Sequence, residues 1–122
     1  MNIIRKLYFR KKFKSKNIFD KLCFVSDKIL KEGYKVGLMY REELMDEIPD
    51  SGWRFLAGNE DDEYMDTPYK HHIVEVKTVC EVDPDIIPYI NSEIGNFYVR
   101  VDKKNFDLDD ETKPIFFSKW NE

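Results

Sequence analysis

Short apolar runs separated by turn residues organise the central part of the chain. Five segments are rich in β-branched, aromatic and aliphatic residues and are predicted as strands: 22–25, 34–40, 53–57, 73–76 and 97–101. In the second of them, alternation predicts Tyr34, Val36, Leu38 and Tyr40 on one face. Residues 115–117 are a candidate edge strand. Because strand follows strand across loops, the pattern favours mainly antiparallel pairing.

Capping residues predict short helices between these strands. Three residues with N-cap chemistry precede helical stretches: Ser26, Asn59 and Asp83. The helix after Asn59 is expected over the acidic residues 60–66, and another helical stretch is expected near 79–82. Together with the strands, these short helices predict an α+β fold: a small single domain, mainly antiparallel sheet with short helices.

The composition is that of a folded domain. Of the 122 residues, 42% are hydrophobic and 15% aromatic, which suffices for one core and argues against disorder. We expect residues 22–122 to form this domain and residues 1–21 to be a basic N-terminal extension. Cys23 and Cys80 lie in apolar stretches and are predicted to be buried, unpaired thiols. With no signal peptide or membrane span in the pattern, a cytoplasmic location is expected.

Charge is distributed unevenly along the chain. Residues 1–35 hold eleven Lys and Arg against three acids, a net charge of +8, although the whole chain has a net charge of −4. Residues 42–66 hold ten acids and one base, Arg54. Such a segment repels nucleic acid and attracts basic surfaces. We therefore expect no nucleic-acid partner for residues 22–122.

Three interpretations of the basic extension remain open. Ile3, Ile4, Leu7 and Tyr8 fall at helical spacing among Lys and Arg residues. The segment could be a helix or tail packed on the domain, an amphipathic helix in weak contact with an anionic membrane, or an arm that binds nucleic acid. The membrane interpretation makes the chain a membrane-surface or regulatory binding protein.

The sequence offers little catalytic chemistry. Its two histidines, His71 and His72, are adjacent and on a strand would point to opposite faces, so at most one can serve a given site. No zinc-binding spacing and no glycine-rich phosphate loop is present, so no metal or cofactor is expected. We expect no enzymatic activity, although a site made of carboxylates alone leaves no readable motif.

The acidic segment is also rich in aromatic residues, a combination that protein interfaces use. Its aromatic neighbours are Tyr40, Trp53, Phe55, Tyr64 and Tyr69. Trp53 has a second interpretation as a core residue, because it lies inside a predicted strand. The hypothesis is an acidic, aromatic-rimmed face that binds a basic surface of another protein, such as the phosphate-binding cleft of a nuclease.

Several stretches of the chain resemble the immunity protein 33 domain, a bacterial family first described as a domain of unknown function. The most specific stretch is Asp50, Ser51, Gly52, Trp53, Arg54 and Phe55. The other similar stretches, in ranges, are 25–37, 39–42, 58–60, 63–64, 83–88 and 95–100. Together these matches span residues 22–101.

The resemblance implies an immunity protein of a polymorphic toxin system, with an α+β fold, no enzymatic activity and a cognate toxin as partner. Four matched positions carry over as candidate binding residues: Trp53, Arg54, Glu60 and Glu63. With their neighbours Asp61, Asp62 and Tyr64 they form the predicted partner-binding set. The identity of the toxin and the oligomeric state do not carry over.

Overall fold

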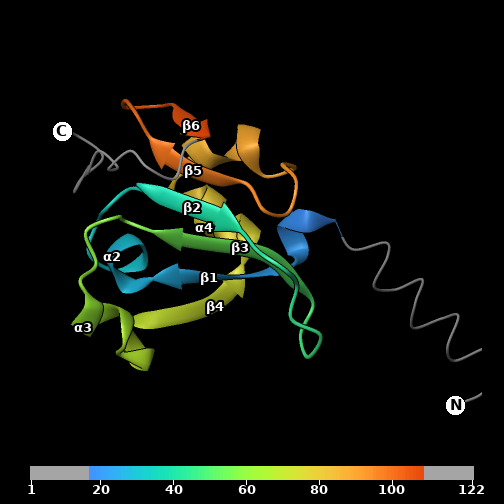
Figure 1. Cartoon of the computed structure of the whole chain (residues 1–122), viewed down its shortest axis with the longest axis horizontal. Helices are drawn as coiled ribbons and strands as arrows, with labels where there is room; N and C mark the ends of the chain where they lie inside the picture. Colours follow the sequence, from blue (N-terminus) through green and yellow to red (C-terminus); the bar gives the residue numbers. More distant parts are fainter. Residues whose placement is uncertain (1–16, 109–122) are drawn as a thin grey trace, which may run out of the picture.

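The computed structural model describes residues 17–108, and six strands in this range form one sheet (Figure 1). In chain order the strands are β1 (Leu22–Ser26), β2 (Leu38–Arg41), β3 (Asp50–Leu56), β4 (His71–Glu75), β5 (Phe97–Arg100) and β6 (Phe106–Leu108). Their order in the sheet is β4-β1-β3-β2-β5-β6. The α+β architecture with short helices is confirmed.

The sheet is antiparallel except for one central pair. β1 runs antiparallel to β4, β2 runs antiparallel to β3 and β5, and β5 runs antiparallel to β6. β1 and β3 are parallel, joined by a crossover that includes α2 and β2. This parallel pair puts Phe24 beside Arg54 at the centre of the sheet.

Short helices connect the strands. They are α2 (Asp27–Leu30), α3 (Asp62–Met65), α4 (Val76–Val82) and the 3₁₀ helices η1 (Ile18–Asp20), η2 (Pro68–Lys70) and η3 (Pro84–Tyr89). Ser26 and Asp83 cap α2 and η3, as predicted. The predicted Asn59 cap is wrong, because Asp61 accepts from the Tyr64 amide at 2.8 Å and starts the helix two residues later.

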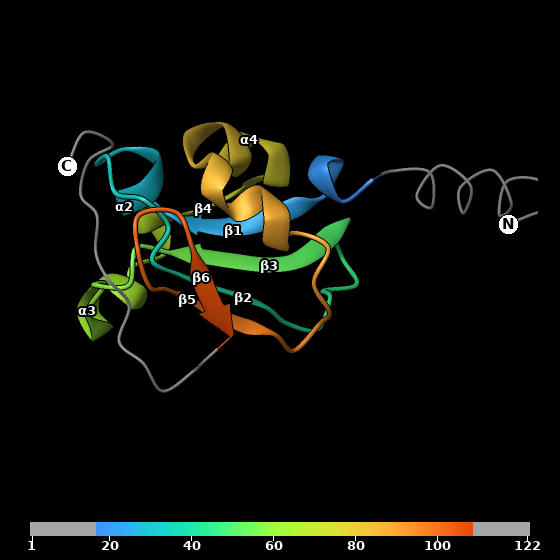
Figure 2. The same cartoon turned by 90° about the horizontal axis from the view of Figure 1, so that it is seen from above.

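The core lies on one face of the sheet, where α2, α4 and η3 cover it (Figure 2). The sheet contributes Cys23, Val25, Met39, Trp53 and Phe55, and the covering layer contributes apolar residues of which Ile29, Val76, Val79, Ile86 and Ile90 are the most buried. The Trp53 indole donates to the Ile90 carbonyl at 2.9 Å, so its one polar group is satisfied inside the core.

The predicted strand over 34–40 is partly wrong. Pairing in β2 begins at Leu38, because the Val36 amide donates to the Asp83 carboxylate at 2.9 Å and the Val36 carbonyl accepts from Arg100 at 2.7 Å. Val36 consequently packs in the core, whereas Leu38 and Tyr40 lie on the opposite face of the sheet. The alternation predicted from Tyr34 onward therefore does not hold.

Part of the predicted extension lies in the described part of the chain. Ile18 and Phe19 of η1 pack against the core. Residues 1–16, with the amphipathic pattern, and the candidate strand 115–117 lie outside the described residues. Within 17–108, no helix has the length and apolar content to cross a membrane.

Candidate functional site

A row of side chains crosses the sheet on the face opposite the core. The strand register places Ile73 beside Phe24, Phe24 beside Arg54, Arg54 beside Tyr40, and Tyr40 beside Phe97. These five residues come from five adjacent strands, and we call them the cross-strand row. Among residues 17–108 no helix lies over this row (Figure 2). The row is mainly apolar, and Ile73 is 54% exposed.

Arg54 is the fixed centre of the cross-strand row. Its guanidinium donates to both carboxylate oxygens of Asp50 at 2.9 and 2.8 Å and to Glu42 Oε1 at 2.7 Å. It also donates to the Trp53 carbonyl and lies 4.2 Å from the centre of the Phe24 ring. These contacts leave Arg54 only 4% exposed.

The charge pair at this centre shifts the pKa of both partners. Burial by itself raises the pKa of the Asp50 carboxyl, but hydrogen bonds from Arg54 and from the Met45 and Gly52 amides bring it below its usual value. Burial likewise lowers the pKa of the Arg54 guanidinium, and its bonds to Asp50 and Glu42 outweigh that effect and raise it. Both groups are therefore held in their charged forms.

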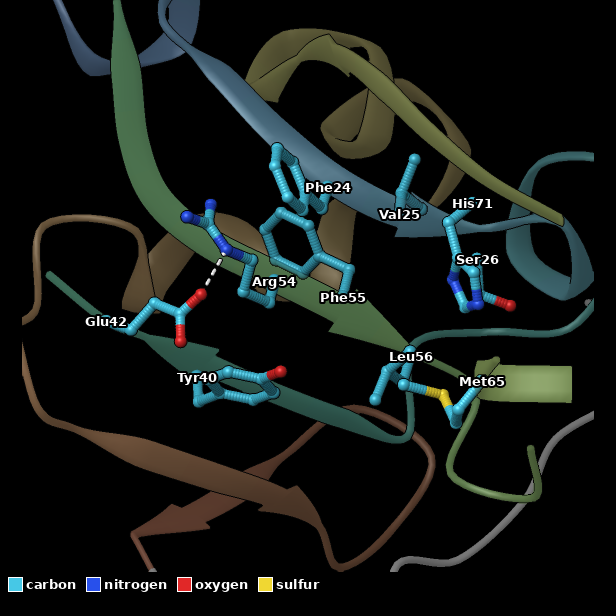
Figure 3. A pocket seen from close by; sticks show the side chains of 10 residues that line it. All are labelled: Phe24, Val25, Ser26, Tyr40, Glu42, Arg54, Phe55, Leu56, Met65 and His71. Carbon is cyan, nitrogen blue, oxygen red and sulfur yellow. Dashed lines mark hydrogen bonds and ion pairs between the residues drawn. The ribbon is translucent and has the colours of Figure 1, made fainter. Parts of the chain in front are cut away.

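A hollow of about 170 Å³ lies next to Arg54 on this face (Figure 3). Phe24, Tyr40, Leu56 and Met65 give it an apolar lining, and Glu42 is its one carboxylate. The Tyr40 ring stacks on Phe97 with ring centres 5.5 Å apart, which holds it along one side of the hollow.

The acidic segment 42–66 does not form one continuous face. Residues 42–47 precede β3 and residues 60–66 follow it, so the seven residues of β3, about 20 Å of extended chain, separate the two groups. Figure 1 shows the loop before β3 and helix α3 at opposite ends of the sheet. The acids therefore lie on the two sides of the cross-strand row, at opposite ends of the strands.

The predicted binding residues fall into two structural groups. Trp53 is fully buried, Arg54 nearly so, and Tyr64 is 9% exposed, so these three lie within the fold in this conformation. The acids Glu60 to Glu63 gather at α3. Glu60 accepts from the Ala57 and Gly58 amides at 2.8 Å, and Asp61 caps α3 from an exposed position. Asp62 and Glu63 are exposed as well.

Tyr64 and His71 attach α3 to the sheet. The two rings meet edge to face with centres 5.6 Å apart, and His71 Nε2 lies 3.1 Å from the Tyr64 carbonyl oxygen. Lys28 and Lys70 lie over the Tyr64 ring at 5.2 and 4.8 Å. The acidic end of the face is therefore rigidly placed relative to the hollow.

Sequence reasoning missed three members of the cross-strand row: Phe24, Ile73 and Phe97. The signal was the alternation in 22–26, where Cys23 and Val25 face the core and Phe24 faces away. Because residues 22–25 are all apolar, the sequence alone hides that alternation. Across 17–108, no group of three or more His, Cys, Asp or Glu is placed to hold a metal ion.

The family model of the immunity protein Imm33 domain matches residues 23–109. The chain belongs to the Imm33 family. The resemblance seen in the sequence is thereby confirmed, and every residue of the cross-strand row lies within the Imm33 match. Neither the curated proteins nor the solved structures give a match to this Imm33 chain.

Proposed function

We propose that this Imm33 protein binds and neutralises a cognate protein toxin in the cytoplasm, without catalysis, and that the toxin docks on the cross-strand row and on the acids on its two sides. Membership of an immunity protein family supports a toxin as the partner in general. The observation that carries the choice of surface is the row itself, a mainly apolar face without a covering helix among the described residues, with acids on its two sides.

The composition of this surface suits protein binding. Apolar side chains at its centre supply area that a partner can bury, and acids at its edges steer a basic partner toward it. Asp62, Glu63 and Asp66 at one end and Glu43, Asp46 and Glu47 at the other are all exposed. The charge of the surface therefore favours a toxin with a basic docking surface.

Co-expression with the toxin encoded beside this gene tests the function. The chain should restore growth of cells that make the toxin, and the two proteins should copurify. The surface is tested by Ile73→Lys, which places a positive charge in the row. Its matched control is Ile87→Lys, because Ile87 is 44% exposed on η3, in the layer that covers the core face.

We expect Ile73→Lys to weaken toxin binding by roughly tenfold or more, and Ile87→Lys to leave it unchanged, since a like charge opposite a basic surface costs binding energy. If both variants still protected cells from the toxin, the docking surface would not be the cross-strand row. Failure of every neighbouring toxin to bind the wild-type chain would refute the function itself.

A further inference from the structure

The hollow beside Arg54 has room for one side chain and an apolar wall to hold it. Its volume is about 170 Å³, and Phe24, Leu56 and Met65 line it together with the Tyr40 ring. Met65 is 41% exposed at the entrance, where α3 meets the end of β3. An unbranched stem from a partner could lie along this wall.

Arg54 does not make the hollow attractive to anions. Four of the five N–H donors of an arginine are directed here to acceptors: two to Asp50, one to Glu42 and one to the Trp53 carbonyl. Two carboxylates face this single guanidinium. The net charge of these three side chains is therefore negative, and the uncompensated negative charge lies at Glu42.

Glu42 keeps an acceptor available for a partner. Only its Oε1 atom bonds to Arg54, and its side chain is 52% exposed. Figure 3 shows the second oxygen on the side of the Tyr40 ring. A cation placed there would meet a carboxylate oxygen and the face of an aromatic ring, two groups that favour a planar guanidinium.

We propose that the hollow receives one arginine side chain from the protein partner, with its stem against Phe24, Leu56 and Met65 and its guanidinium between Glu42 and Tyr40. This inference rests on the proposed function, since it names the chemistry by which the docking surface selects its partner. The arginine is an anchor at the centre of the surface, whereas the acids at the two ends act at longer range.

The anchor can be tested without any toxin. The full chain, labelled at Met and Leu methyl groups, is titrated with N-acetyl-arginine amide, and the signals of Met65 and Leu56 are followed by NMR. The matched probe is N-acetyl-citrulline amide, which has the same shape without the charge. We expect saturable shifts of both signals, with the arginine probe binding roughly three to five times more tightly.

Two variants assign the effect to the hollow. Glu42→Gln should reduce affinity for the arginine probe by roughly three to five times and leave citrulline binding unchanged, because it removes the charge but not the shape. Glu43→Gln, a neighbouring exposed acid outside the hollow, should change neither affinity. Leu56→Trp fills the hollow while keeping every charge, and it should abolish binding of both probes. This variant tests the hollow independently of any effect of Glu42→Gln on the position of Arg54.

Three results would overturn the proposal: equal affinity for both probes, an equal effect of Glu42→Gln and Glu43→Gln, or no saturable shift at Met65. The last result also covers a hollow already occupied by another part of the same chain or by a second copy, and only the second copy would give shifts that depend on protein concentration. Toxin neutralisation by a chain that ignores the arginine probe would refute the anchor and leave the proposed function intact.

Discussion

At the scale of single residues, the most specific sequence block builds the scaffold of the surface. Asp50 accepts hydrogen bonds from the Gly52 and Met45 amides as well as from Arg54, and Trp53 is locked to the Ile90 carbonyl. These residues hold the row in place from below. This block of sequence therefore supports the fold of the surface, and the proposed contacts with a partner fall to the exposed side chains around it.

Asp50→Asn should destabilise the fold by about 3–5 kcal/mol, because it leaves the buried Arg54 guanidinium without its bidentate partner. Urea denaturation measures the change in the free energy of unfolding. Glu42→Gln is the control, since Glu42 bonds the same guanidinium from an exposed position and should cost about 1 kcal/mol or less.

The same variant tests how stability depends on pH. The pKa of Asp50 in the folded protein lies below its usual 3.8, so the unfolded chain binds the proton more tightly. The stabilising contribution is complete above that usual value and is lost as the pH falls through the folded pKa. Asp50→Asn should flatten this acid limb of the stability curve, and an unchanged limb would contradict the assignment.

The two thiols should be nearly inert in the folded protein. Both are buried and free, and burial raises the pKa of Cys80 to about 11 and that of Cys23 further still. Few thiolates then exist at neutral pH. With an aromatic disulfide reagent we expect both thiols to react at the rate of unfolding, and rapidly in urea; one fast thiol in native buffer would show an exposed cysteine.

At the scale of elements, β3 depends on an irregularity at Gly52. Leu22 pairs with Asp50 and Phe24 with Arg54, so an advance of two positions along β1 corresponds to an advance of four along β3, and the register shifts between them. Residues four apart on a regular strand are about 13 Å apart, too far for a short carboxylate and a guanidinium to pair comfortably. The bulge brings Asp50 and Arg54 together.

Gly52→Ala should therefore lower stability by about 2–3 kcal/mol or more. Gly52 has a φ of +86°, and an added Cβ would lie 2.5 Å from the Glu42 carbonyl oxygen. Gly95→Ala is the matched control, because Gly95 has a φ of +100° but nothing within 4 Å of the added atom. Thermal unfolding compares the two, and equal losses would mean that φ alone, without the contact, sets the cost.

The elements that local chemistry specifies were predictable, and those that depend on long-range pairing were not. Ser26 and Asp83 act through amides two residues away, so their caps were visible in the sequence. The parallel pairing of β1 with β3 has no local signal. Glu60 was predicted inside a helix, but its carboxylate accepts hydrogen bonds from the Ala57 and Gly58 amides. These bonds form only when the chain makes a turn between residues 57 and 60.

At the scale of the whole molecule, one acidic stretch of sequence becomes two groups with different tasks. β3 carries residues 42–47 and 60–66 to opposite ends of the sheet. Within the second group, Glu60 and Asp61 accept hydrogen bonds from backbone amides, and Asp61, Asp62 and Glu63 are exposed. Counting acids in the sequence could not separate carboxylates that stabilise a turn from carboxylates that attract a partner.

The double substitution Asp62→Lys with Glu63→Lys should slow association with the toxin encoded by the neighbouring gene by roughly tenfold at about 0.02 M salt. Exposed charges attract a basic partner during its approach, and the substitution reverses two of them. The difference from wild type should shrink at about 0.3 M salt, where the charges are screened. Stopped-flow binding measures both rates. Glu60→Gln with Asp61→Asn is the contrasting pair, and it should lower stability through the weakened amide contacts. Its rate should stay closer to wild type, because it neutralises two charges where the Lys pair reverses two, and only Asp61 of its two residues is exposed. The reverse ranking of the two pairs would refute this division of the acids.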